Sequence, residues 1–149
     1  MGVILDTSIL IALERGLIDI DKLIADKGDQ PFGISVITAS ELLHGVYRAD
    51  TEKRRLKREA FVEKVLETFP VYPFDIIAAR IYAKIWANLA QNGIVVGAHD
   101  LIIASTAIAL GFSVLTFDLR DYTKIKEVTI EKFHRHNKLN KVSDFACLD

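Results

Sequence analysis

Short apolar runs that alternate with helical segments constrain the fold of this chain more than any other feature of its sequence. The first run, Val3-Ile4-Leu5, is apolar at every position, which is typical of a strand buried on both faces of a parallel sheet. Further strands are predicted at 34–37, 71–72 and 112–116, with a fifth at 128–130. Strands that alternate with helices across short connections pair in parallel through right-handed crossovers. We therefore predict an α/β domain with a central parallel sheet of four to five strands.

Periodicity and capping residues place the helices between these strands. Helices are predicted at 7–15, 19–25, 38–46, 51–69, 75–93 and 100–110. The segment 100–110 is apolar on every face, which indicates a helix in the middle of the molecule. Neither a repeat nor a linker interrupts the chain before His134. Residues 1–133 are therefore predicted to form one domain, followed by a C-terminal tail, 134–149, whose order the sequence does not determine.

Composition narrows the class of protein. The chain is 50% apolar and 26% charged, with a net charge of −1, so it is globular and lacks the overall basic character usual in proteins that bind nucleic acid by charge alone. Cys147 is the single cysteine, which excludes an intrachain disulfide and a cysteine-based zinc site. No signal-peptide pattern or apolar run of membrane length is present, so we expect a cytoplasmic protein with no membrane contact.

Acidic residues follow the predicted strands. Asp6 comes directly after the first strand, Glu41 one turn after the second, and Asp118 two residues after the fourth. Residues just beyond parallel strands share one edge of the sheet, where ligands bind in open α/β folds, so these acids are expected to converge there. Asp100 heads the apolar helix and joins them if the chain has returned to that edge.

Clustered carboxylates repel one another unless protons or cations neutralise them. Oxygen ligands without histidine or cysteine at ligand spacing favour Mg²⁺ or Mn²⁺ over zinc. Such ions orient and activate water for the hydrolysis of phosphodiester bonds. The acids therefore indicate a metal-dependent enzyme that acts on phosphodiesters.

Three other interpretations stay open on the residues alone. The acids can be helix caps in a non-catalytic binding module: Asp6 precedes a helix, and Thr38 with Glu41 matches the S/T-x-x-E capping box. A phosphatase with Asp6 as nucleophile usually has a second acid two residues later, where this chain has Ser8. The basic run 53–58 is interpreted as a solvated helix face or as a contact for RNA phosphate.

Four segments together resemble the motifs of PIN-domain ribonucleases, in particular the VapC-type toxins of toxin–antitoxin pairs. They are Ile4-Leu5-Asp6-Thr7-Ser8, Ser40-Glu41-Leu42-Leu43-His44-Gly45, the segment from Gly97 to Ala107, and the segment from Leu115 to Tyr122. The similarity runs in order from residue 3 to about 133. It implies a three-layer PIN-like fold and a Mg²⁺- or Mn²⁺-dependent endoribonuclease that forms a homodimer and is held inactive by a cognate antitoxin. A PIN-domain nuclease that processes RNA without an antitoxin is the alternative.

The resemblance also assigns roles to residues. It implies that Asp6, Glu41 and Asp100 are catalytic metal ligands and that Asp118 is a more variable fourth. It gives Thr7 and Thr116 a supporting role, in which they help to hold the site. From its distance past the strand end, Asp121 is predicted to support the site by capping the turn or by pairing with neighbours of Arg120. Phe117 stands where the family often has arginine, which removes a contact for phosphate. His44 and His99 are expected to point away from the site.

Overall fold

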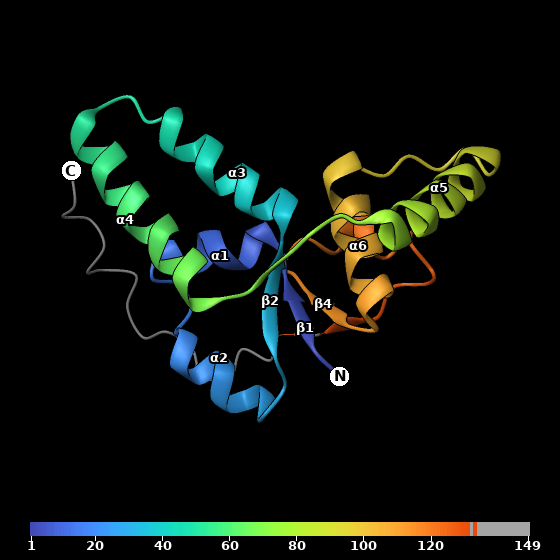
Figure 1. Ribbon diagram of the computed structural model, residues 1–149, viewed down its shortest axis with the longest axis horizontal. Coiled ribbons are helices and arrows are strands. Elements are labelled where there is room, and N and C mark those ends of the chain that lie inside the picture. Colours follow the sequence, from blue (N-terminus) through green and yellow to red (C-terminus); the bar gives the residue numbers. More distant parts are fainter. Residues whose placement is uncertain (132, 134–149) are drawn as a thin grey trace.

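The computed structural model describes residues 1–131 and 133, and these form three layers, with helices on both faces of a parallel sheet (Figure 1). The strands are β1 (Val3–Leu5), β2 (Phe32–Ser35), β3 (Val71–Tyr72), β4 (Ser113–Leu115) and β5 (Ile130–Glu131). The helices are α1 (Thr7–Glu14), α2 (Ile20–Lys27), α3 (Val36–Tyr47), α4 (Glu52–Thr68), α5 (Ile76–Gln91), α6 (Ala98–Leu110) and α7 (Leu119–Tyr122). The predicted fold class is confirmed.

The strands follow the order β3-β2-β1-β4-β5, and every pair is parallel. β1 is therefore the central strand, with Ile4 opposite Gly33 of β2 and Val114 of β4. All three residues of β1 are fully buried, because both faces of a central strand are covered. This position explains why the N-terminal run is apolar without alternation.

Two cores lie on opposite faces of the sheet, because successive side chains of a strand point to opposite sides. Val3 and Leu5 pack in one core with residues of α1 to α4, whereas Ile4 packs in the other with residues of α5, α6 and α7. Figure 1 shows α1, α3 and α4 on one side of the sheet and α5 with α6 on the other. The apolar helix α6 lies within the second core, as its composition predicts.

The boundary between β2 and α3 differs from the prediction. The strand ends at Ser35, two residues earlier than expected, and α3 begins at Val36. The reason is that the Ser35 hydroxyl accepts a hydrogen bond from the Ile37 N–H at 3.3 Å and so caps the helix. The apolar residues after Ser35 are therefore the first turn of α3. The capping box that Thr38 and Glu41 could have formed is therefore absent, because Ser35 is the N-cap of α3.

Three smaller differences affect the second half of the chain. α6 begins at Ala98, two residues before the predicted start, and β5 lies at Ile130–Glu131. The turn after β4 contains the four-residue helix α7, which was not predicted. The proposed domain end at residue 133 stays a prediction, since 134–149 lie outside the described residues.

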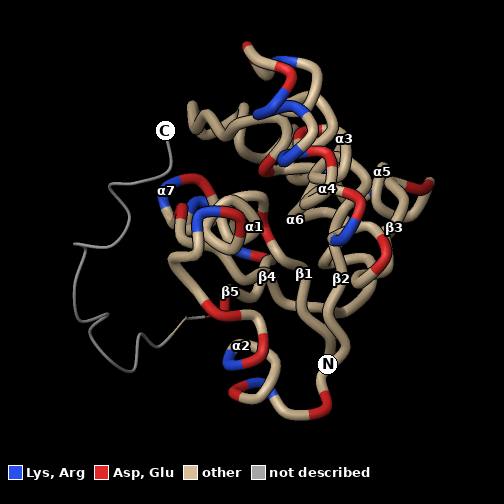
Figure 2. The backbone as a smooth tube through the Cα atoms, turned by 90° about the vertical axis from the view of Figure 1, so that its left-hand side faces the viewer, with Lys and Arg blue, Asp and Glu red and all other residues tan. Residues whose placement is uncertain are grey.

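Several charged side chains of α4 form ion pairs, within the helix or with neighbouring segments. Figure 2 shows Lys and Arg interleaved with Asp and Glu along the chain. Arg54 pairs with Asp50 at 2.9 Å, and Arg58 lies 3.4 Å from Glu14. These ion pairs favour the interpretation of the basic run as a solvated helix face. No helix within the described residues is both long and apolar enough to span a membrane.

Candidate active site

Asp6 lies directly after β1, at the carboxyl edge of the sheet, and only 4% of its surface is exposed. It is the N-cap of α1, and its Oδ2 accepts a long hydrogen bond from the Ser8 N–H at 3.4 Å. Three hydroxyl groups also donate to this carboxylate, those of Ser8 at 2.7 Å, Thr116 at 2.8 Å and Tyr122 at 2.9 Å. Helix capping therefore explains one of four contacts, and the other three fix the orientation of the carboxylate.

Tyr122 is a site residue that the sequence analysis did not single out. Its side chain is fully buried, and its hydroxyl donates to Asp6 Oδ1. Burial and the negative charge of Asp6 raise the pKa of Tyr122 far above its ordinary value, so the hydroxyl stays a neutral donor. The available signal was that a tyrosine inside a fold needs a partner for its hydroxyl. Sequence alone does not identify that partner, because 116 positions separate the two residues.

Glu41 is in the second turn of α3, since the helix begins at Val36. The Thr7 hydroxyl donates toward Glu41 Oε1 at 3.4 Å, and His99 Nδ1 lies 3.5 Å from the same oxygen. Burial raises the pKa of Glu41, an effect that His99 opposes and the charge of Asp6 reinforces. Glu41 is therefore not a cap. The expectation that His99 points away from the proposed ligands is wrong.

Asp100 lies in the first turn of α6 and is half-buried. Burial raises its pKa to about 7, helped by a hydrogen bond with Asp121 and by the negative charges of Asp6, Asp121 and Asp118. Asp121 behaves in the opposite way, because its Oδ2 accepts from the Gly97 N–H at 3.0 Å and this contact lowers its pKa. Below about pH 7 Asp100 is therefore the member of this pair that holds a proton, while Asp121 is charged.

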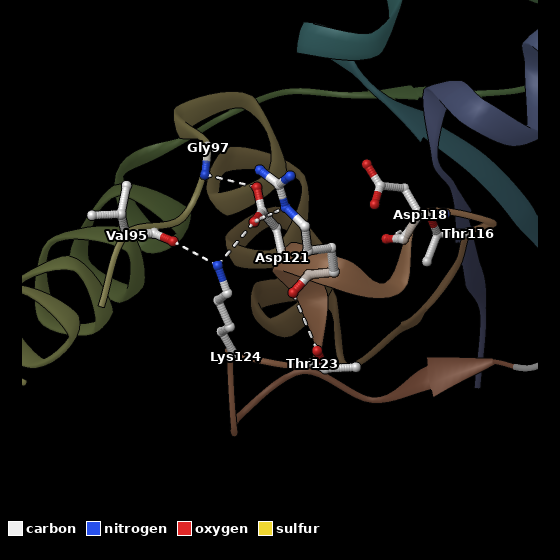
Figure 3. Close-up of polar contacts among 8 residues, drawn as sticks. Val95, Gly97, Thr116, Asp118, Asp121, Thr123 and Lys124 are labelled. Atoms are coloured by element: carbon white, nitrogen blue, oxygen red, sulfur yellow. Dashed lines mark hydrogen bonds and ion pairs between the residues drawn. The ribbon is translucent and has the colours of Figure 1, made fainter. Parts of the chain in front are cut away.

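Figure 3 shows how Asp121 joins two segments of the chain. Asp121 projects from α7 toward Gly97, the N-cap residue of α6. Lys124 Nζ lies 3.5 Å from Asp121 Oδ1 and donates to the Val95 carbonyl at 3.1 Å. The carboxylate therefore holds the loop before α6, and with it the start of the helix that carries Asp100. Asp121 was predicted to cap the turn in which it lies, but its carboxylate accepts a hydrogen bond from this neighbouring loop.

Asp118 contrasts with Asp121. It precedes α7, is exposed, and makes no side-chain capping bond. Its backbone N–H donates to the Thr116 hydroxyl at 2.9 Å, and in Figure 3 its carboxylate stands apart from that of Asp121. Because its charge contributes to the raised pKa of Asp100, Asp118 lies within electrostatic range of the other acids.

The four predicted acids thus lie near one edge of the sheet, and each raises the pKa of another acid or has its own raised. Their donors are all carboxylate oxygens, which are the ligands that Mg²⁺ and Mn²⁺ prefer. Among residues 1–131 and 133, no three acidic, histidine or cysteine side chains converge closely enough to form a complete cation cage. A Mg²⁺ ion typically binds one or two carboxylates and keeps several waters, so it does not require three protein ligands.

Comparison with known proteins identifies the family. Residues 3–128 match the PIN domain, and the chain is 41% identical over 133 residues to Ribonuclease VapC1 of Rickettsia felis. That alignment covers 87% of this chain and 95% of the relative. The chain belongs to the VapC family of PIN-domain proteins. A second VapC relative, Ribonuclease VapC of Rickettsia bellii, is 42% identical over 130 residues, with the same shares covered.

Solved VapC structures have the same fold. The DNA-bound VapBC of Salmonella typhimurium matches with a TM-score of 0.77 at 30% identity, over 88% of this chain and 97% of that one. VapBC2 of Rickettsia felis, bound to a DNA fragment from its promoter, matches with a TM-score of 0.81 over 89% of this chain and 99% of that one. At 23% identity the second comparison shows the fold alone.

Proposed function

We propose that this VapC protein is a Mg²⁺- or Mn²⁺-dependent endoribonuclease and the toxin of a toxin–antitoxin pair in the cytoplasm. The observation that carries the proposal is the position of Asp6, Glu41, Asp100 and Asp118 near one edge of the sheet, where burial and neighbouring carboxylates raise the pKa of Asp100 to about 7. Such crowding disfavours the apo site at neutral pH and favours a divalent cation. The VapC relatives, named as ribonucleases, support RNA as the substrate.

Each proposed ligand has a separate support from the fold. The hydroxyls of Ser8, Thr116 and Tyr122 hold Asp6, and the Thr7 hydroxyl with the His99 ring orients Glu41. Asp121 accepts the Gly97 N–H, which in a capping box goes to a residue in the first turn of the helix, so Asp100 does not serve as the cap of α6. Asp100 hydrogen-bonds Asp121 instead. A bound Mg²⁺ would supply activation of water and stabilisation of charge on phosphate oxygens.

We further propose that the active form is a homodimer and that a cognate antitoxin protein inhibits it. The solved relatives support the second point, since they are described as VapBC complexes or toxin–antitoxin complexes. The experiment is to purify the chain with its antitoxin, separate the two under denaturing conditions, and refold the toxin. The refolded toxin is expected to cut RNA in Mg²⁺ or Mn²⁺, to stop with chelator, and to be silenced when antitoxin is added.

The substrate panel for that experiment includes total RNA, single-stranded oligonucleotides and initiator tRNA. The tRNA is included because a Salmonella typhimurium relative, 36% identical over 98 residues, is named a tRNA(fMet)-specific endonuclease. The Asp6→Asn variant controls for contaminating nuclease, because it keeps a side chain of the same size. Equal cutting by this variant, or by the wild type in excess chelator, would contradict the proposed activity.

A non-catalytic binding module is the second candidate, and the capping of α1 by Asp6 favours it. Under that function the RNA panel would stay intact in every metal. Helix capping does not account for the other acids, because Glu41 lies inside a helix and Asp118 makes no side-chain capping bond. A helix cap requires neither position.

A further inference from the structure

A hydrogen bond between Tyr122 and Asp6 joins a residue of the second core to a residue of the site. Tyr122 is the largest of the fully buried side chains in the described part of the chain, and it packs in the second core. Its hydroxyl is the polar atom that reaches out of that core, and it donates to Asp6 Oδ1 at 2.9 Å. A phenylalanine would fill the same space without any polar group to satisfy.

The two oxygens of Asp6 are held from different sides. Oδ2 accepts from the Ser8 hydroxyl at 2.7 Å and from the Thr116 hydroxyl at 2.8 Å. Oδ1 accepts from Tyr122, its only hydroxyl donor among the described residues. Donors at both oxygens prevent rotation of the carboxylate about its Cβ–Cγ bond. Without the tyrosine hydroxyl, the carboxylate would be held through Oδ2 alone.

We propose that Tyr122 is a positioning residue, which fixes the orientation of the Asp6 carboxylate that would hold the divalent cation. This inference rests on the proposed function, because it takes Asp6 as a metal ligand. Partners that hydrogen-bond a ligating carboxylate orient it, and their removal typically lowers metal affinity or activity by about 10–100-fold. Tyr122 of α7 therefore connects the second core to the site through its hydrogen bond with Asp6.

The first test is the Tyr122→Phe variant, which removes one oxygen and keeps the packed ring. Mn²⁺ binding to the chelator-treated protein, measured by electron paramagnetic resonance of the free ion, is expected to weaken about tenfold. Cleavage of RNA is expected to fall with it, and saturating metal is expected to restore part of the rate. The matched control is Tyr82→Phe. The half-buried ring of Tyr82 lies on α5 and packs against Trp86 of the same helix and against Phe74, which precedes the helix.

The outcomes separate positioning from a merely structural role. A Tyr122→Phe protein that melts at a lower temperature but binds Mn²⁺ as tightly as the wild type would overturn the proposal. Unchanged or tighter binding together with unchanged cleavage would overturn it as well. Weaker binding in Tyr122→Phe, with no change in Tyr82→Phe, supports it.

A second measurement needs no substitution at Tyr122. The chain has four tyrosines, so 3-fluorotyrosine labelling gives four ¹⁹F resonances, and single Phe variants at Tyr47, Tyr72 and Tyr82 assign the fourth to Tyr122. Added Mg²⁺ is expected to shift this resonance and to leave the Tyr47 resonance unchanged, since Tyr47 is 83% exposed. A Tyr122 resonance that does not respond to saturating Mg²⁺ would overturn the proposal.

Failure of this inference is distinguishable from failure of the proposed function. If Asp6→Asn abolishes cleavage while Tyr122→Phe changes neither binding nor rate, only the inference fails. If the wild type binds metal and cuts no RNA, the proposed function fails, and the Mn²⁺ affinities still decide the role of Tyr122.

Discussion

Asp118 and Asp121 differ in what they contact, although only two residues separate them. Asp121 is buried, and it accepts from Gly97 and pairs with Lys124, whereas Asp118 is exposed and its carboxylate makes no capping bond. A carboxylate without competing partners is the more available for a metal or for its bound water. This difference supports Asp118 as the fourth acid and leaves Asp121 to support the site.

Substitution of each acid tests this assignment. Asp118→Ala is expected to lower metal-dependent cleavage on the order of a hundredfold, through loss of a ligand or of an outer-shell contact. Asp121→Ala is expected to cost far less cleavage but to lower the melting temperature, because the Gly97 N–H loses its acceptor. Asp121→Asn restores an acceptor and serves as the control. Reversed effects on cleavage would give the metal role to Asp121.

The start of α3 decides what Glu41 can do. Ser35 caps this helix, and Glu41 lies on its second turn, where the intrahelical hydrogen bonds leave no free N–H to cap. The same helix packs Ala39, Leu42 and Val46 into the first core. One element therefore anchors the fold and presents an acid at the sheet edge.

Two variants of α3 separate these functions. Glu41→Gln is expected to abolish cleavage and to leave the melting temperature of the apo protein equal or higher, because burial and Asp6 already disfavour the charged form. Ser35→Ala is expected to cost about 1 kcal/mol of stability through loss of the cap, and to retain cleavage below its melting temperature. Thermal melts and cleavage assays of both variants check this. An unfolded Glu41→Gln protein together with a stable Ser35→Ala protein would contradict the assigned cap.

At the scale of the whole molecule, the acidic edge makes stability depend on pH. The native state keeps the Asp100 proton up to a pKa of about 7, whereas the ordinary value is 3.8. Between these values the native state binds more protons than the unfolded state, so the free energy of unfolding falls as pH rises. The raised pKa of Glu41 acts in the same direction.

This dependence is measurable in chelator. The wild type is expected to lose stability between about pH 4 and pH 7 relative to Asp100→Asn, whose amide carries no charge in either state. Excess Mg²⁺ is expected to stabilise the wild type more at pH 8 than at pH 5, because it binds the deprotonated carboxylates. Denaturant melts at several pH values provide the test. Parallel pH curves for the wild type and Asp100→Asn would contradict the raised pKa.

The sequence by itself determined the architecture and the placement of most acids. Unbroken apolar character at 3–5 indicates a central parallel strand, and the alternation of strands with helices then brings residues that follow strands to one edge. Asp6 and Asp118 needed only this rule. These properties are local or topological, so spacing and residue type suffice to predict them.

Only the tertiary structure decided the contacts that orient the acids. Tyr122 reaches Asp6 and Asp121 reaches Gly97 across 116 and 24 positions of sequence, and no periodicity encodes such pairs. The start of α3 was likewise decided by one hydroxyl at Ser35 within a run whose residue types suit either a strand or a helix. Side-chain hydrogen bonds and burial depend on how the elements pack. The fold therefore decides whether the pKa of each acid at this edge is raised or lowered, although the acids themselves are visible in the sequence.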